Sequence, residues 1–263
     1  MKIVVFDLDE TMGYFTEFGI FWDCLLNYLK VKNKKVLNQT DFNDILDLFP
    51  EFLRPNIINI LSYLKQKKNS NCCHKMLIYT NNTGPREWAN HIISYFEKKI
   101  HFKLIDQIIA AFKVNGKRIE ICRTSYNKSH KDLIKCTKIP INAEICFLDD
   151  SFYPEMANDN IYYINIKPYY YDLDFEYMLS TFKNSKIGKN ILDKDCEDFN
   201  ESMMKDLKRY KYNVVEKDNK EYELDKILGK EIINHLQEFF SKSKKNKTYR
   251  NFSFKKNKTQ RKY

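Results

Sequence analysis

The beginning of the chain says most about its fold, because the apolar run Met1 to Phe6 leads directly into Asp7-Leu8-Asp9-Glu10-Thr11. A short continuous apolar run bounded by polar residues predicts a strand that is buried on both faces of a sheet. Asp7 and Asp9 follow at its carboxyl end, where open α/β sheets place their ligands. Because two close carboxylates repel each other, they need a cation or a shared proton. We therefore expect a metal ion here, and Mg²⁺ suits a site that offers only hard oxygen ligands.

Further apolar runs predict more strands of the same kind. They cover residues 75–79, 104–111, 144–148 and 161–166. Segments with helical spacing or helix-start signals separate them, including 18–30, a stretch opened by Arg54-Pro55 and another opened by Gly84-Pro85. Strands that alternate with helices predict an α/β fold with a parallel sheet and right-handed crossovers.

The polar residues at the predicted strand ends have the types that phosphoryl transfer needs. Asp7 is the expected nucleophile, since a carboxylate can accept a phosphoryl group as an aspartyl-phosphate. Asp9 lies two residues further on, on the same side of the strand, and is expected to protonate the leaving oxygen and later to deprotonate water. Thr80 would supply a hydroxyl, beside backbone N–H groups of the turn that follows it.

Three more residues complete the expected site. Lys131 would neutralise charge on the transferring group and hold the nucleophile, while Asp149 and Asp150 would offer distal oxygen ligands to Mg²⁺. An acid pair or a threonine after one strand is often only a turn. The whole set, in this order and each at the end of a buried strand, predicts a phosphoryl-transfer site.

These residues resemble the four motifs of the haloacid dehalogenase (HAD) superfamily. The matches are Asp7-x-Asp9-x-Thr11, Thr80, a lysine and Asp149-Asp150. The resemblance implies a Rossmann-like three-layer domain around a central parallel sheet, a metal site of Asp7, Asp9 and Asp150, and supporting roles for Thr11 and Asp149.

Within that superfamily the chain is most similar to the RNA polymerase II CTD phosphatases, or NLI-interacting-factor-like family. The similarity lies in residues 7–11 (DLDET), Leu53-Arg54-Pro55, Lys131-Asp132-Leu133 and Asp150-Ser151-Phe152. It makes Lys131 the expected motif lysine, ahead of Lys113 and Lys128. It implies a phosphoserine or phosphothreonine protein as substrate, and a domain over residues 1–182 without a large cap.

Two departures leave other substrates open. Thr80-Asn81-Asn82 stands where that family favours Thr-Ala-Ser, and is more like phosphatases of small molecules and nucleic-acid ends; Asn81 is an expected phosphate ligand. The insert at about residues 12–53 reads as helical, where that family has strands. A catalytically silent scaffold that binds a partner is a third hypothesis, from a different class of function.

The remaining residues divide into a predicted helical extension, 183–240, and a basic tail, 241–263. Ten of the 45 Lys and Arg lie in the tail, so the other 35 equal the 35 Asp and Glu of residues 1–240. Such a block is expected to be disordered and to contact polyanions, nucleic acid among them.

The seven cysteines show no paired spacing, so we expect free thiols in a reducing compartment. No apolar run is long enough to span a membrane, and the first predicted strand leaves no room for a signal peptide. The expected location is the cytoplasm or nucleus. Large DNA viruses encode similar phosphatase-like proteins, and if a virus encodes this chain, the compartment is that of an infected cell.

Overall fold

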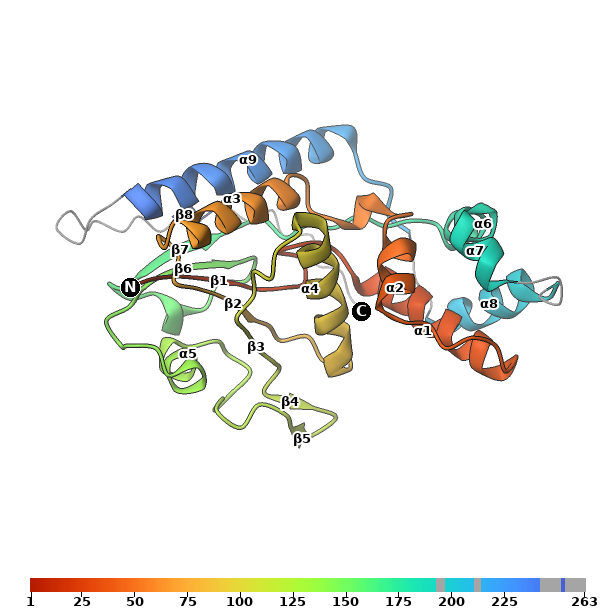
Figure 1. Ribbon diagram of the computed structural model, residues 1–263, viewed down its shortest axis with the longest axis horizontal. Coiled ribbons are helices and arrows are strands. Elements are labelled where there is room, and N and C mark those ends of the chain that lie inside the picture. The colour runs from red at the N-terminus through yellow and green to blue at the C-terminus, as the bar shows by residue number, and fades with distance from the viewer. Residues whose placement is uncertain (193–196, 211–213, 242–251, 254–263) are drawn as a thin grey trace.

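A parallel β-sheet forms the centre of the protein. The computed structural model describes residues 1–192, 197–210, 214–241 and 252–253. Its sheet has the strand order β3-β2-β1-β6-β7, with the two-residue β8 on the edge of β7 (Figure 1). The strands are β1 (Lys2–Phe6), β2 (Lys75–Tyr79), β3 (Gln107–Ile109), β6 (Glu144–Asp149), β7 (Ile161–Asn165) and β8 (Phe252–Ser253). Every pairing between them is parallel. The predicted α/β class is confirmed.

Both faces of the sheet are buried, which explains why its central strands read as continuous apolar runs. Val4 and Phe6 of β1 face a large core shared with α3 (Ile57–Asn69), α4 (Arg86–Ile100) and α9 (Asn219–Ser241). Ile3 and Val5 face a smaller core under α5 (His130–Thr137). In Figure 1, α3 and α9 lie on one side of the sheet and α5 on the other.

The segment predicted as a helical insert contains α1 (Thr16–Val31), α2 (Gln39–Leu46) and the short 3-10 helix η1 (Pro50–Phe52). Phe18 of α1 packs against the rings of Phe42, Phe49 and Phe52, with ring centroids 5.4 to 6.3 Å apart. Further along the chain come α6 (Phe175–Asn184), α7 (Lys186–Ile191), α8 (Phe199–Leu207) and the 3-10 turn η3 (Lys208–Tyr210). Figure 1 shows α1 together with α6 to α8 on the side of the molecule away from the N-terminus.

The boundary expected after residue 182 falls inside α6 and does not coincide with the end of an element. Asp174 caps the start of α6, and the buried side chain of Phe182 lies within the helix, which continues to Asn184. The predicted extension is not separate from the sheet either. Its helix α9 accepts hydrogen bonds from Lys2 Nζ at the carbonyl oxygens of Phe239 and Phe240.

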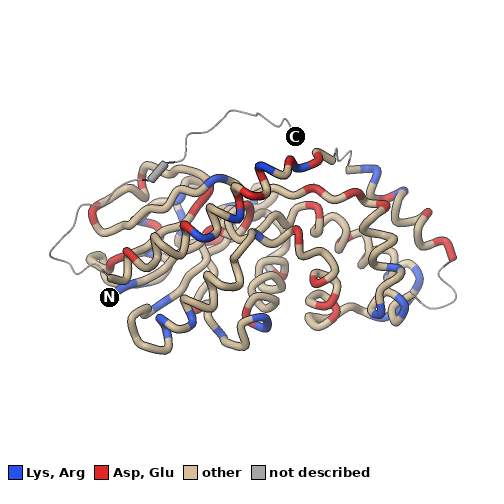
Figure 2. Tube along the Cα trace, turned by 90° about the horizontal axis from the view of Figure 1, so that it is seen from above, with Lys and Arg blue, Asp and Glu red and all other residues tan. Residues whose placement is uncertain are grey.

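Most of the predicted disordered tail lies outside the described residues. Of the tail residues that the structure describes, Ser241 ends α9, and the backbone of Phe252–Ser253 pairs with β7 as β8. Acidic and basic residues are interspersed over the described elements (Figure 2). No described helix is both long and apolar enough to cross a membrane.

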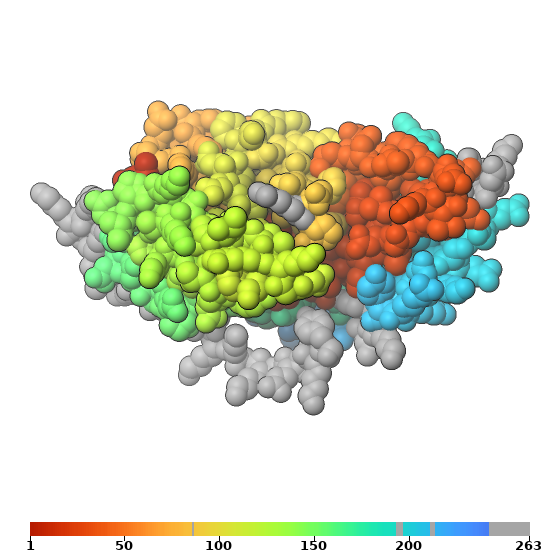
Figure 3. All heavy atoms as spheres, turned by 90° about the horizontal axis from the view of Figure 1, so that it is seen from below, coloured from red at the N-terminus to blue at the C-terminus, as the bar shows by residue number. Residues whose placement is uncertain are grey.

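A small antiparallel hairpin stands beyond the end of β3. It consists of β4 (Lys113–Val114) and β5 (Lys117–Arg118), with Gly116 at a positive φ of 77° in its turn. The yellow-green region that contains it forms part of the surface seen from below (Figure 3). A second 3-10 turn, η2 (Pro154–Met156), lies between β6 and β7.

Candidate active site

The register of the sheet brings the two predicted acidic motifs together. Phe6 of β1 pairs with Leu148 of β6, so the next residues, Asp7 and Asp149, lie side by side at the carboxyl edge. The backbone N–H of Asp7 donates to the Leu148 carbonyl at 2.9 Å. On the other side of β1, Phe6 pairs with Ile78, which places Thr80 at the same edge. The carboxyl ends of three neighbouring strands therefore supply the site.

Lys128, and not the expected Lys131, is the lysine that contacts the acids of this site. Lys128 Nζ lies 2.6 Å from Asp7 Oδ1 and 2.6 Å from Asp149 Oδ2, and its side chain is 1 % exposed. Lys131 is an exposed residue of α5 and makes neither contact. Burial alone would lower the pKa of Lys128, but the charges of Asp7 and Asp149 more than reverse this and raise it.

The helix start explains the difference between the two lysines. Ser129 is the N-cap of α5, and its hydroxyl accepts from the backbone N–H of Asp132. Lys128 therefore precedes the helix and lies at the sheet edge, whereas Lys131 lies in the first turn. The pattern Ser129-x-x-Asp132 is a capping signal, so the sequence contained the information that would have separated the two lysines.

Three carboxylates gather in a group that could hold a metal ion. One oxygen each of Asp7, Asp149 and Asp150 lies within 4.8 Å of the others. Thr11 supports Asp150, because its hydroxyl accepts from the Asp150 backbone N–H at 3.2 Å and lies 3.4 Å from Asp150 Oδ1. Burial, with the Asp7 charge adding to it, raises the pKa of Asp150.

The side chain of Asp9 is not part of that group, contrary to the predicted metal ligands. Asp9 Oδ2 instead accepts from Asn82 Nδ2 at 2.8 Å. Burial first, and the neighbouring Asp7 charge second, raise the pKa of Asp9 to about 7. The acidic group contains Asp149 and Asp150, both expected as distal oxygen ligands, together with Asp7.

The turn after β2 is ordered by its own polar side chains. The Thr80 hydroxyl accepts from the backbone N–H of Asn82 at 2.9 Å, and Asn82 Oδ1 accepts from the N–H of Gly84 at 2.8 Å. Those two N–H groups are thus engaged within the turn. The sequence analysis expected N–H groups of this turn to be available to a ligand, and these two are not. The Thr80 hydroxyl keeps its own proton to donate.

A buried arginine fixes the loop that carries Asp9. Arg54 Nε donates to the Thr11 carbonyl at 2.6 Å, and Arg54 Nη2 donates to the carbonyls of Glu10 and Lys167. Glu10 has a positive φ of 58°, uncommon for a residue with a side chain, so the loop conformation depends on such contacts. From the sequence, Arg54 was expected to open a helix and to belong to a family motif, not to hold this loop.

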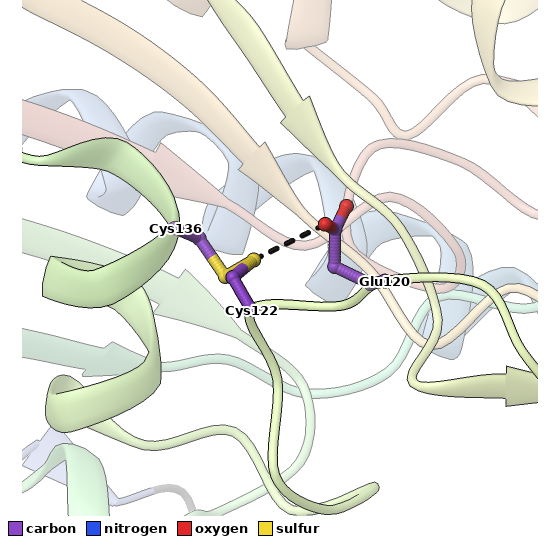
Figure 4. Close-up of side chains that lie close together, drawn as sticks. All are labelled: Glu120, Cys122 and Cys136. Atoms are coloured by element: carbon purple, nitrogen blue, oxygen red, sulfur yellow. Dashed lines mark hydrogen bonds between the residues drawn. A yellow bond between two sulfur atoms is a disulfide. The ribbon is translucent and has the colours of Figure 1, made fainter.

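Two of the seven cysteines form a disulfide, which corrects the expectation of free thiols throughout. Cys122 and Cys136 are bonded, with their Cα atoms 5.1 Å apart, and Glu120 Oε1 lies 3.1 Å from Cys122 Sγ (Figure 4). Oxidised sulfurs offer no thiolate to a metal, so these three residues are not a metal site in this state. The closed segment carries both Lys128 and Arg123, another fully buried cation.

Comparisons with known proteins add no assignment to this geometry. No protein-family model matches the chain. No curated protein and no solved structure matches it significantly.

Proposed function

We propose that the protein is a Mg²⁺-dependent phosphatase, a phosphoric monoester hydrolase of the HAD type, that works through an aspartyl-phosphate on Asp7. The observation that carries this proposal is the meeting of Asp7, Lys128, Asp149 and Asp150 at one sheet edge, beside the turn of Thr80. Phosphoryl transfer needs a positioned nucleophile and compensation of charge more than any elaborate covalent chemistry.

The donor set fits a hard divalent cation. Asp7, Asp149 and Asp150 offer only carboxylate oxygens, and with Lys128 as the one ammonium among them, two negative charges remain when all four are ionised. Mg²⁺ prefers such ligands, keeps several waters and is commonly held by one or two carboxylates with substrate phosphate. When bound, it would neutralise charge on the phosphate oxygens.

The buried ion pairs support the proposed role of Asp7 as nucleophile. Lys128 holds one oxygen of Asp7 in place, which leaves the other oxygen to attack phosphorus. Lys128 also stays protonated because two carboxylates surround it, so it compensates the charge that accumulates during transfer.

Asp9 is the proposed proton donor to the leaving oxygen. With a pKa of about 7 it retains its proton in a substantial fraction of molecules near neutrality. Asn82 fixes the orientation of its carboxyl group. After the leaving group departs, the ionised Asp9 would accept a proton from the attacking water.

The test compares the wild-type protein with Asp7→Asn on an aryl phosphate in the presence of Mg²⁺. We expect Asp7→Asn to lose at least about a thousand-fold in kcat, because the nucleophile itself is removed. Asp174→Asn, at a helix cap outside the site, is the matched control and should keep its activity. Equal rates for wild type and Asp7→Asn would refute the proposal.

Phosphoserine or phosphothreonine in protein is the proposed substrate, on the strength of the motif resemblance. A nucleic-acid end is the second candidate, favoured by the basic β4–β5 hairpin, which is linked through Arg118 and Arg123 to the Thr80 carbonyl. The hairpin carries Lys113, Lys117 and Arg118, and the nearby ring of Tyr126 is 51 % exposed. Oligonucleotide ends that react faster than phosphopeptides, with a strong salt dependence, would favour the second candidate.

A further inference from the structure

Arg123 is a wholly buried cation that the proposed chemistry does not use. Its exposed fraction is 0 %. Nη1 donates to the carbonyls of Thr80 and Ala110, each at 2.9 Å. Nη2 donates to Asn81 Oδ1 at 2.7 Å and to the carbonyl of Tyr126 at 2.9 Å. The guanidinium also lies over the ring of Tyr79, 4.7 Å from its centroid.

These contacts join the ends of two strands at the site. Tyr79 and Ile109 pair in the sheet, so Thr80 and Ala110 are the residues with which β2 and β3 leave it. One guanidinium nitrogen bridges their two carbonyls. Arg123 therefore fixes where the turn that begins at Thr80 departs from the sheet.

The same guanidinium determines how the Asn81 amide is oriented. Because Nη2 of Arg123 can only donate, it takes the oxygen of that amide and leaves the NH₂ group to face Tyr153, whose hydroxyl accepts at 3.0 Å. The ring of Tyr153 in turn lies 5.3 Å from Lys128 Nζ. A continuous set of contacts thus runs from Arg123 to the cation that holds Asp7.

We propose that Arg123 is a positioning residue for the phosphate-binding turn, acting through Thr80 and Asn81 and not through contact with substrate. This inference rests on the proposed function. The planar guanidinium of Arg123 donates from two nitrogens to four acceptors. The single ammonium of a lysine cannot reproduce this forked geometry. Loss of the fork would free the turn and weaken its hold on phosphate.

A purely structural role would give a different result. If Arg123 only tied down its own loop, its loss would lower stability, while the folded protein would bind phosphate as before. If it positions the turn, phosphate affinity falls in protein that is still folded, and the change depends on Asn81. Phosphate affinity and stability therefore have to be measured on the same variants.

The experiment uses Arg123→Lys and Arg123→Gln, with Lys135→Gln, an exposed residue of α5, as the matched control. Inorganic phosphate binding in Mg²⁺, KM and kcat on an aryl phosphate, and Tm are measured for each. We expect both Arg123 variants to bind phosphate about ten-fold or more weakly and KM to rise by a similar factor, because hydrogen bonds from a charged donor are lost. The change in kcat should be smaller, and Lys135→Gln should match wild type.

Asn81→Ala completes the test and also serves if the Arg123 variants do not fold. The phosphate affinity of Asn81→Ala should fall too. The double variant Arg123→Gln/Asn81→Ala should bind phosphate only slightly more weakly than the single variant with the lower phosphate affinity, as expected for residues that act as one unit. Additive losses, or wild-type phosphate affinity in folded Arg123→Gln or in Asn81→Ala, would overturn the inference. If the wild type binds phosphate but hydrolyses nothing, the proposed function fails, while phosphate affinity still decides the role of Arg123.

Discussion

Lys128 Nζ lies 2.6 Å from Oδ1 of Asp7, and both side chains are buried at the carboxyl edge of the sheet. The second contact of Lys128, to Asp149, makes this lysine the one ammonium shared by two of the three clustered acids. Removing it leaves two buried carboxylates without their counter-charge, which is costly in a poorly solvated site.

We predict that Lys128→Gln loses at least about a hundred-fold in kcat/KM, because its charge stabilises the transferring group. With metal removed by a chelator, the variant should also unfold at a lower urea concentration. Its free energy of unfolding should fall by about 3–5 kcal/mol, the cost of removing one partner of a buried ion pair. Lys131→Gln is the matched control, since Lys131 is exposed, and should change neither quantity appreciably. Loss of activity in Lys131→Gln alone would contradict this assignment.

Metal binding should depend on Asp150. We predict that Mg²⁺ raises the Tm of the wild type. At a hundred times the Kd for Mg²⁺, the free energy of unfolding should increase by about 2.7 kcal/mol. Asp150→Asn should lose most of this response, because a neutral amide replaces one of the three clustered carboxylates. Asp174→Asn, another Asp-to-Asn change, should respond to Mg²⁺ as the wild type does. Equal Mg²⁺ responses in all three proteins would argue against the metal site.

Glu17 should make stability depend on pH. It is 0 % exposed, its Oε2 accepts from the backbone N–H of Leu173, and burial raises its pKa to about 8. The native state therefore favours the protonated form, so the stability that Glu17 contributes is present below its unfolded pKa and is lost as pH rises towards 8.

The comparison for this prediction is Glu17→Gln, which does not titrate. Between pH 5 and 8, on the order of a few kcal/mol of unfolding free energy should be lost by the wild type relative to the variant. Urea unfolding at several pH values measures the difference. A constant difference across this range would show that Glu17 does not titrate as described.

The Cys122–Cys136 disulfide should stabilise the segment that carries the buried cations Arg123 and Lys128. The two cysteines lie 14 positions apart, and a disulfide that closes a loop of this size contributes about 3 kcal/mol. We predict that a dithiol reductant lowers the Tm of the wild type and of Cys72→Ser, but not that of Cys122→Ser/Cys136→Ser. Alkylation of both Cys122 and Cys136 in unreduced, denatured protein would contradict the pairing.

Much of the fold follows from local signals in the sequence. Strand β1 could be predicted because burial on both faces demands an uninterrupted apolar run such as residues 3–6. The meeting of Asp7 with Asp149 was also predictable, since both follow buried strands of one parallel sheet. Their proposed catalytic roles remain predictions.

The residues that the sequence analysis missed are linked across long separations in the chain. Asn82 reaches Asp9 over 73 positions, and Arg123 reaches Thr80 over 43. Such contacts depend on strand register and on the path of the connecting loops, which residue types alone do not determine. The disulfide could not be predicted for the same reason, because it joins Cys122 of a loop to Cys136 of helix α5 and so depends on the path of the chain between them. Lys128 is different, since the cap at Ser129 marked the helix start.

The most direct test of the central claim is to trap the phosphoryl group on the protein. Rapid acid quench of the wild type with Mg²⁺ and an aryl phosphate that carries radioactive phosphorus should leave label on the peptide that contains Asp7, while Asp7→Asn should carry none. Turnover by the wild type with no label on that peptide, or label that persists in Asp7→Asn, would contradict an aspartyl-phosphate mechanism at Asp7.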